Sequence, residues 1–507
     1  MKIKTVVLLS FILTAGPVSA GLVESNVTVE DLPSFSLDTL GSSTLLSTDI
    51  WQQSDEETLF QLIDKIGTTP LTPASKKALI LLLTQDTTGY QTSSQKSEVQ
   101  NPFLVKRLEA LFRLAAFDEV LSLINSIPKE SLSDEIIKIK ILTLLMVGNL
   151  SEAEELINNT DFSLFTTKAR INLFLEKEER NKAILSYEIY KESQDKSDEL
   201  FMALAENVLL EIDTPLPNET LSTPEHIFLL SRLKNKDIDF LKQAEPIRKT
   251  LIQLPSVPIE TRILLAESIQ LPATELSKIY TLPLFDIKID KDYLKRAELY
   301  QKIQKTTNQN EKEKLLNDLL QSAFKDKKIF YLAPLFEEEL NKIIPMHDNI
   351  SLAFPAVQIY ALQGNLEKAY SWYQLLKESN LENHQKEQLM LIPILQNLGA
   401  GLPTETATLI YRFCTQQNEA FCSPFFARLD PSFDVELNIN RTSEEIILPT
   451  EYLKKENKLK TGENLLRAIL DLNDEAIKDK KQIIDFIKTT TPQTISKDIV
   501  QEGLIYQ

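Results

Sequence analysis

Two stretches decide the fold: Leu144–Ala153, which reads LLMVGNLSEA, and Tyr360–Ala369, which reads YALQGNLEKA. Both run from an apolar segment through Gly-Asn-Leu to an alanine five residues after the glycine. Gly148 and Gly364 end a helix where the left-handed backbone conformation costs least. The alanine leaves room for the following helix to lie close against the first. Each stretch therefore predicts two antiparallel helices joined by a tight turn.

Two further stretches are looser copies of this pattern. Leu114–Val120 reads LAAFDEV, and Glu178–Ala183 reads EERNKA. The turn positions of the three N-terminal copies are residues 115, 148 and 178, which are spaced 33 and 30 residues apart. A nearly constant spacing of this length is typical of helix–turn–helix units that stack into an array.

The rest of the chain also favours helices. Apolar residues recur at helical spacing, for example at Leu104, Leu108 and Leu111. The 507 residues include only 11 glycines, and phosphate-binding loops and tight hairpins need glycine for positive φ angles. We therefore predict an all-α fold from residue 51 onward. A short strand at Leu284–Ile289 is the alternative for that one stretch.

The repeated pattern resembles the motifs of the tetratricopeptide repeat family. Those motifs have a Gly or Ala before the turn, an acidic or Asn residue after it, and an Ala in the second helix. The resemblance covers only the four copies above. It implies helix pairs stacked into a curved superhelix, an α-solenoid, whose concave face binds a peptide or a protein. On this interpretation Gly148, Ala153, Gly364 and Ala369 are residues of repeat packing.

Changes in composition along the chain predict five parts. Prolines recur between residues 211 and 300 and indicate short helices there, so this section is either a hinge or a continuous part of the array. The parts are a signal peptide (1–20), an extended linker (21–50), N-terminal helical repeats (51–210), a proline-punctuated irregular helical section (211–345) and C-terminal helical repeats (346–507).

The beginning of the chain has the anatomy of an export signal. Lys2 and Lys4 precede a short apolar run, and small residues lead up to Ala20 as signal peptidase requires. The run is shorter than the about 20 residues that span a bilayer, although an uncleaved anchor is the alternative. Gly21 in place of Cys excludes the usual bacterial lipid attachment. We predict cleavage after Ala20 and a periplasmic mature chain with no membrane-spanning segment; secretion is the alternative.

The charge of the chain restricts its partners. The formal net charge is −18, and removal of the signal peptide would make it more negative. An acidic surface repels the phosphates of nucleic acid and anionic lipid headgroups. We therefore expect no nucleic acid as partner. The resemblance and the export signal together imply a protein or peptide of the cell envelope. The sequence leaves the oligomeric state open.

The only two cysteines are Cys414 and Cys422. On one continuous helix, residues eight apart would lie about 12 Å apart, whereas a disulfide needs Cα atoms within about 7 Å. Because the predicted compartment is oxidising, we predict a disulfide and a helix break around residues 416–418. The alternative is two buried thiols on one helix face.

Groups that could carry chemistry are few. The histidines, His226, His347 and His384, lack the spacing of a zinc-binding helix, and we expect them at the surface or at helix caps. Glu-Ser pairs occur at positions 192, 267 and 378, but the Gly-rich segment that follows this pair in lytic transglycosylases is missing. We expect no catalytic residue, no metal and no cofactor.

Four aromatic residues cluster in the second of the two best repeats: Tyr360, Tyr370, Trp372 and Tyr373. Packing between helices is the main interpretation, and a binding hot spot is the alternative. We predict a non-enzymatic, exported scaffold of helical repeats that binds a protein or peptide. The alternative is an envelope glycan hydrolase or lyase, or a regulator of one, whose catalytic carboxylate the sequence does not reveal.

Overall fold

The computed structural model describes residues 50–52, 54–67, 71–87, 101–160, 163–193, 198–216, 224–233, 239–269, 271–285, 287–326, 328–378, 461–473 and 481–492, together with a few single or paired residues elsewhere. Within these ranges the chain forms helices and no β-strand, so the prediction of an all-α fold is confirmed. The described part of the stretch 284–289 is not a strand. The predicted signal peptide, Cys414 and Cys422 lie outside the described residues.

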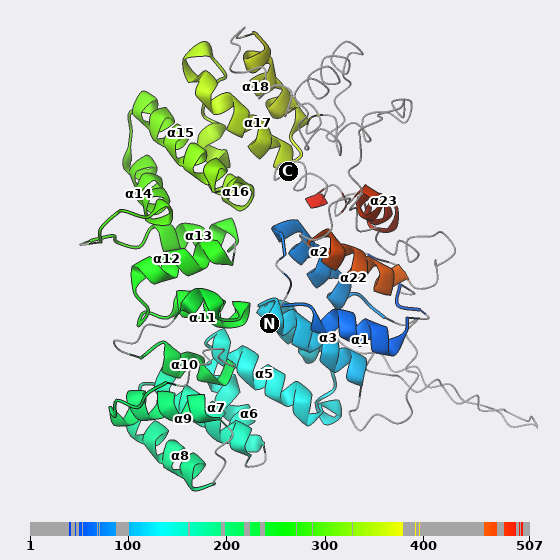
Figure 1. Cartoon of the computed structure of the whole chain (residues 1–507), viewed down its shortest axis with the longest axis vertical. Coiled ribbons are helices and arrows are strands. Elements are labelled where there is room, and N and C mark those ends of the chain that lie inside the picture. The colour runs from blue at the N-terminus through cyan, green and yellow to red at the C-terminus, as the bar shows by residue number, and fades with distance from the viewer. Residues whose placement is uncertain are drawn as a thin grey trace, which may run out of the picture. The chain divides into compact units, whose positions relative to one another are not determined.

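The N-terminal helices follow one another as antiparallel pairs (Figure 1). Within a pair, α3 contacts α4, α5 contacts α6 and α7 contacts α8, while the first helices of successive pairs also touch. The helices are α1 (Glu56–Asp64), α2 (Pro73–Thr84), α3 (Pro102–Arg113), α4 (Phe117–Asn125), α5 (Asp134–Met146), α6 (Leu150–Asn159), α7 (Leu164–Glu176), α8 (Arg180–Glu192) and α9 (Glu199–Ala205), which runs into a π-helical turn, η3 (Glu206–Leu210).

Local sequence accounts for several helix starts. Thr72 caps α2 by accepting a hydrogen bond from the Ser75 backbone N–H, and Pro73 takes the first helical position, where a missing N–H costs nothing. Ser163 caps α7 in a reciprocal arrangement with Thr166.

The proline-punctuated middle section is helical as well. Pro258 and Pro272 stand at the N-caps of α12 and α13, and Pro246 lies in the first turn of α11. Here α11 packs on α12, α12 on α13 and α14, and α14 on α15. The helices of this section are α10 (Ile227–Leu230), α11 (Glu245–Gln253), α12 (Ile259–Ser268), α13 (Ala273–Tyr280), α14 (Asp292–Lys305), α15 (Gln309–Lys325) and α16 (Ile329–Leu340).

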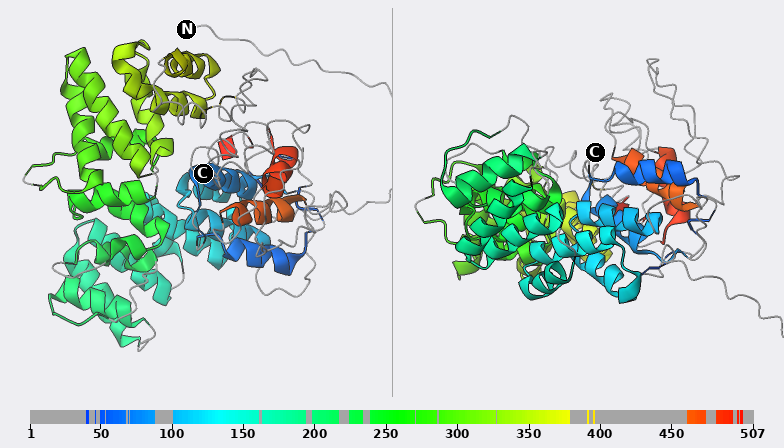
Figure 2. Two further views of the ribbon diagram at one scale, coloured as in Figure 1. Left: turned by 45° about the horizontal axis from the view of Figure 1, so that its top comes forward. Right: turned by 90° about the horizontal axis from the view of Figure 1, so that it is seen from below.

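The last described helices are α17 (Ala353–Leu362), α18 (Leu366–Glu378), α22 (Thr461–Leu472) and α23 (Lys481–Thr490). The predicted division groups α22 and α23 with the C-terminal repeats. The structure instead places α22 against α1 and α2, about 400 residues earlier in the chain, as the views of Figures 1 and 2 agree.

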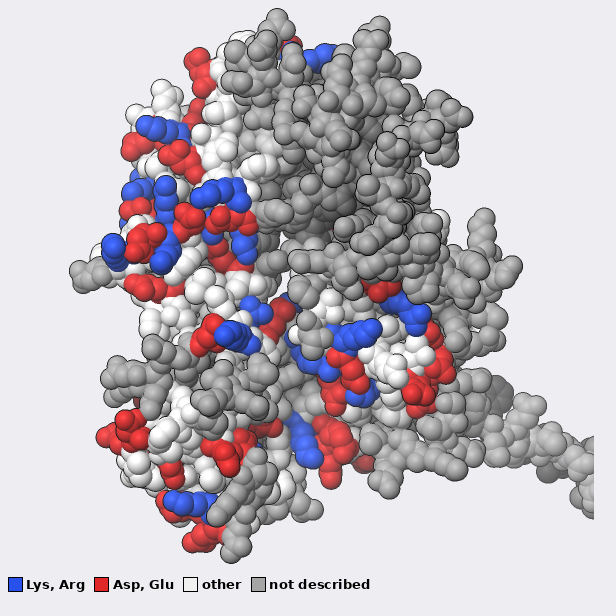
Figure 3. Space-filling model, in the orientation of Figure 1, with Lys and Arg blue, Asp and Glu red and all other residues white. Residues whose placement is uncertain are grey.

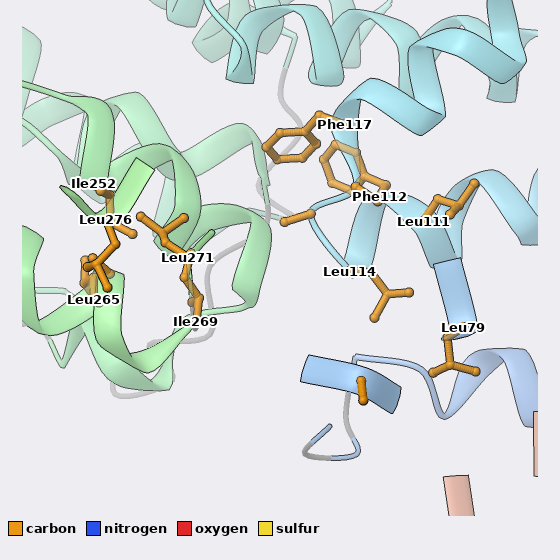
Figure 4. Close-up of a cluster of buried hydrophobic side chains, with 14 of the residues drawn as sticks. Leu79, Leu111, Phe112, Leu114, Phe117, Ile252, Leu265, Ile269, Leu271 and Leu276 are labelled. Carbon is orange, nitrogen blue, oxygen red and sulfur yellow. The ribbon is translucent and has the colours of Figure 1, made fainter. Parts of the chain in front are cut away.

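The middle section meets the N-terminal helices at α11. The ammonium of Lys249 donates to the Ala115 carbonyl at 3.0 Å and lies 5.2 Å from the centre of the Phe117 ring. Lys76 of α2 forms an ion pair with Glu245 of α11. Figure 4 shows the buried side chains on both sides of this junction, with Phe112, Leu111, Leu114, Phe117 and Leu79 from α2–α4 on one side and Ile252, Leu265, Ile269, Leu271 and Leu276 on the other.

Surface charge is mixed in sign. On the described part of the face shown in Figure 3, Lys and Arg side chains lie among Asp and Glu side chains. None of the helices that the structure describes is both long enough and apolar enough to cross a membrane.

Candidate functional site

The turns of the four predicted repeats share one backbone geometry. Gly148 and Gly364 have φ angles of 76° and 70°, and Ala115 and Glu178 have φ angles of 53° and 59°. After each helix, one N–H returns to the carbonyl five residues earlier, at 3.0, 2.9, 2.8 and 2.8 Å in chain order. This is the Schellman arrangement that satisfies the last helical carbonyls. The left-handed position is therefore occupied at all four turns, twice by a residue other than glycine.

The residue five positions after each turn is fully buried. Ala153 and Ala369 occupy this position in the two best copies, and Val120 and Ala183 occupy it in the looser ones. In each case its N–H donates to the carbonyl of the residue just after the turn, at 3.0 or 3.1 Å. Glu211 is also left-handed and stands 33 positions after Glu178. Sequence reasoning missed it because prolines follow in place of a second helix.

Three of the four predicted binding aromatics are buried. Tyr360, Trp372 and Tyr373 belong to the core, whereas Tyr370 is 41% exposed. The Tyr360 hydroxyl donates to Asn341 at 3.0 Å, and burial together with the charge of Glu337 raises its pKa to about 12. The main interpretation, packing between helices, therefore describes three of these residues. Tyr370 alone is accessible to a partner.

A pair of exposed apolar residues lies on α8. Leu185 is 64% exposed and Ile189 is 39% exposed, and their spacing of four places them on one side of the helix. The opposite side of α8 carries the buried residues Ala183, Tyr187 and Tyr190. We call Leu185 and Ile189 the α8 pair. The sequence did not lead us to predict this pair. Two apolar residues four positions apart, on the side of the second helix opposite its buried face, could have indicated it.

The other N-terminal repeats are polar at the same two positions. Counted from the left-handed residue, the equivalents are Ser122 and Ser126 next to α4 and Glu155 and Asn159 on α6, and all four are exposed. The repeat geometry therefore does not require apolar residues there. The α8 pair is a local feature of the third repeat.

A buried carboxylate occurs in the middle section. Glu267 on α12 accepts two hydrogen bonds from Arg296, one from Nε at 2.9 Å, and a third from the Tyr280 hydroxyl at 2.6 Å. The side chains of Glu267 and Arg296 are 5% and 3% exposed. Burial and the charge of Glu267 raise the pKa of Tyr280 well above its ordinary value. Three hydrogen-bond donors thus converge on the carboxylate.

The same network reaches two more helices. Arg296 also donates to Asp326 and, at 3.1 Å, to Ser322 of α15. The ammonium of Lys328, next to α16, donates to the Glu267 carbonyl at 3.2 Å. Burial alone would lower the pKa of Arg296, but Glu267 and Asp326 outweigh it and raise that pKa. We interpret the network as a structural tie between α12 and α16, because both oxygens of the Glu267 carboxylate already accept hydrogen bonds from Arg296 or Tyr280.

A second polar cluster surrounds Asp198, the N-cap of α9. Its carboxylate accepts from Lys168 Nζ at 2.6 Å and lies 3.0 and 3.1 Å from His226 Nε2. Of the two positions expected for it, the surface or a helix cap, His226 takes the cap: it is 3% exposed and stands at the N-cap of α10. The Lys168 ammonium also lies 5.5 Å from the Tyr190 ring centre and 5.2 Å from that of Phe201.

The charges of this cluster stabilise one another. Burial alone raises the pKa of Asp198, but hydrogen bonds from His226 and Lys168 outweigh it and hold that pKa far below its ordinary value. Burial lowers the pKa of Lys168, but Asp198 outweighs that effect and raises it. The cluster joins α7, α9 and η4 (Pro224–His226).

Comparison with known proteins adds no further site. Among the described residues, no group of three or more His, Cys, Asp or Glu side chains is arranged to hold a metal ion. The chain matches no protein-family model, no curated protein and no solved structure.

Proposed function

We propose that the protein is an exported, non-enzymatic scaffold of helical repeats that binds a protein or peptide of the cell envelope. The observation that carries the proposal is the α8 pair, two exposed apolar side chains at repeat positions that are polar in the neighbouring repeats. The regular turns support the resemblance to tetratricopeptide repeats and, with it, a curved superhelix.

The α8 pair fits a partner that presents an apolar side chain or an amphipathic helix. Because Leu185 and Ile189 are already partly buried, covering the rest of each side chain would contribute less than the about 1.5–3 kcal/mol of full burial, before the costs of association. Lys182 and Glu188 are exposed on the same helix and would orient the partner by charge. Contiguous exposed apolar patches rimmed by polar residues mark contact sites, and we assign the α8 pair to the centre of such a patch.

Glu267 gives no support to the alternative of a glycan hydrolase or lyase. Glycoside hydrolases generally place a pair of carboxylates on either side of the bond that they cleave. Glu267 instead faces an arginine and a tyrosine hydroxyl, and its side chain is buried.

Photo-crosslinking in intact cells tests the proposal. A benzoylphenylalanine at position 185 should form a covalent adduct with the partner, and the same residue at position 122, its equivalent next to the first turn, should not. Exchange of both α8-pair residues for glutamate should abolish partner recovery, whereas Ser122→Glu with Ser126→Glu should leave it intact. Equal adducts at both positions, or full recovery by the α8 variant, would overturn the proposal.

A further inference from the structure

Helix α22 is shared between the first two helices of the chain. It contacts both α1 and α2, each of which also packs on α3, while α23 lies against α22 (Figure 2). Its buried residues include Leu465, Leu466 and Ile469, at the spacing of one apolar face. In this way α22 completes a group of four helices whose other members lie about 400 residues earlier in the chain.

The contact is closest at Trp51. The indole is fully buried and lies edge-on to Phe103 of α3, with ring centres 5.4 Å apart. A Cβ atom on Gly462 would lie 2.7 Å from the Trp51 ring and 2.8 Å from the Ile50 carbonyl. The Gly462 N–H donates to that same carbonyl at 2.6 Å. Any larger residue at position 462 would therefore push α22 away from Trp51.

Hydrogen bonds fix both ends of α22. Near its start, the Glu463 carboxylate accepts from the Asp55 N–H at 2.9 Å, next to the beginning of α1. Just after its end, the Asn473 side chain accepts from the Thr72 N–H at 3.0 Å and donates to Ser75 Oγ at 2.9 Å. These contacts lie at the N-terminal ends of α1 and α2. They therefore fix the position of α22 along those helices as well as its direction.

One group at this contact is left unsatisfied. The indole N–H of Trp51 is buried and has no acceptor among the described residues. A buried donor without a partner costs about 1–3 kcal/mol. A helix that supplied an acceptor opposite Trp51 would regain this energy and could replace α22.

We propose that the face of α1 and α2 around Trp51 is a helix-binding site, and that α22 with α23 is an internal ligand that keeps it closed. The site takes an amphipathic helix that begins with glycine and an acidic residue and lays its apolar side between α1 and α2. Release of α22 and α23 would open a second docking surface, separate from the α8 pair. The inference extends the proposed scaffold function but rests on contacts that do not involve α8.

The accessibility of Trp51 tests the closed state. Because the chain has only two tryptophans, Trp372→Phe in the full chain leaves Trp51 as the sole reporter. In this background acrylamide should quench the fluorescence weakly, and Gly462→Val should raise the Stern–Volmer constant several-fold. Ser151→Val, at the second position of α6 and exposed, is the matched control and should change nothing. Continued shielding of Trp51 in Gly462→Val would overturn the proposal.

Binding in trans tests the site itself. A fluorescein-labelled peptide of residues 461–490 should bind the full-length Gly462→Val chain at least tenfold more tightly than the wild-type chain, in which the site is occupied. The same peptide carrying Gly462→Val should not bind. Asn473→Ala, which removes the bonds to Thr72 and Ser75, serves as a milder second release variant.

An exposed Trp51 without peptide binding in either release variant would refute a helix-binding site, and so would equal binding to the wild-type chain. A chain with both α8-pair residues changed to glutamate should retain the quenching and peptide results. Failure of the scaffold proposal is therefore distinguishable from failure of this one.

Discussion

Arg296 and Glu267 form a buried, two-point ion pair that joins α14 to α12, with the guanidinium Nε 2.9 Å from one carboxylate oxygen and Nη2 bonded to the other. Both side chains are almost inaccessible to solvent. Bidentate geometry and the added Tyr280 hydroxyl leave the carboxylate well satisfied. The pair therefore makes two helices of the middle section depend on each other.

Loss of one partner of this pair should be costly. Arg296→Ala leaves the Glu267 charge buried without its main counterion and should lower the free energy of unfolding by about 3–5 kcal/mol. Arg296→Met and Glu267→Leu, singly and combined, form a cycle with the wild-type chain, and the double change, which removes both charges, should cost less than the sum of these two single changes. Urea denaturation of the four chains measures the coupling, and strictly additive effects would contradict it. Lys302→Ala, at an exposed position of α14, is the control.

The left-handed turns predict a stabilising substitution. Glu178 adopts a φ of 59°, which costs a residue with a side chain about 1–2 kcal/mol. Glu178→Gly should therefore raise the free energy of unfolding by up to about 1 kcal/mol, after the entropy that glycine adds to the unfolded chain. Gly148→Ala should lower it, although no atom lies near the new Cβ. Glu179→Gly, at a φ of −92°, is the control and should not stabilise.

Stability should fall at acid pH through Asp198. Its pKa in the folded protein is held below the unfolded value of about 3.9, so its contribution is complete above that value and is lost as the pH falls further. Asp198→Asn should be less stable than wild type at pH 7, and the difference should shrink as the pH falls below about 4. A constant difference from pH 7 to pH 2 would contradict this origin.

Lys168 should make the stability of the protein fall at alkaline pH, the opposite of the effect of Asp198. Its folded pKa is raised above the ordinary value of about 10.4. Its contribution is therefore complete below that pH and is lost as the pH rises through the folded pKa. Guanidinium denaturation of Lys168→Met and wild type between pH 8 and pH 12 should show the two stabilities converging at the alkaline end. Lys182, on the exposed side of α8, provides the control position.

The export signal and the cysteines give one joint prediction. N-terminal sequencing of the mature protein should begin at Gly21, and mass spectrometry of non-reduced peptides should find Cys414 linked to Cys422. Cys414→Ala should then cost a few kcal/mol at most, because the closed loop is short. An intact Met1 would contradict the predicted cleavage, and free thiols in protein from the periplasm would contradict the disulfide.

Local sequence determined the helix pairs of this protein. A Gly-Asn-Leu turn followed by alanine encodes its own hydrogen bonds within about ten residues, so the turns at Gly148 and Gly364 could be predicted from the chain alone. Ala115 and Glu178 adopt the left-handed backbone conformation at a cost in energy, yet their spacing was enough to predict them as turn residues. All of these features depend on interactions between residues close in sequence. The spacing of apolar residues and the conformational preference of each residue type indicate such interactions directly.

Tertiary structure decided the rest. Whether Tyr360 or Tyr370 faces the core depends on which helices pack on α17 and α18, and the pairing of Glu267 with Arg296 joins residues 29 positions apart. The docking of α22 beside Trp51 joins segments about 400 residues apart, and no local pattern marks it. Such contacts follow from the complementarity of whole surfaces. The close approach of Gly462 to the Trp51 indole is one example. The sequence contains both residues, but it does not show that they contact each other.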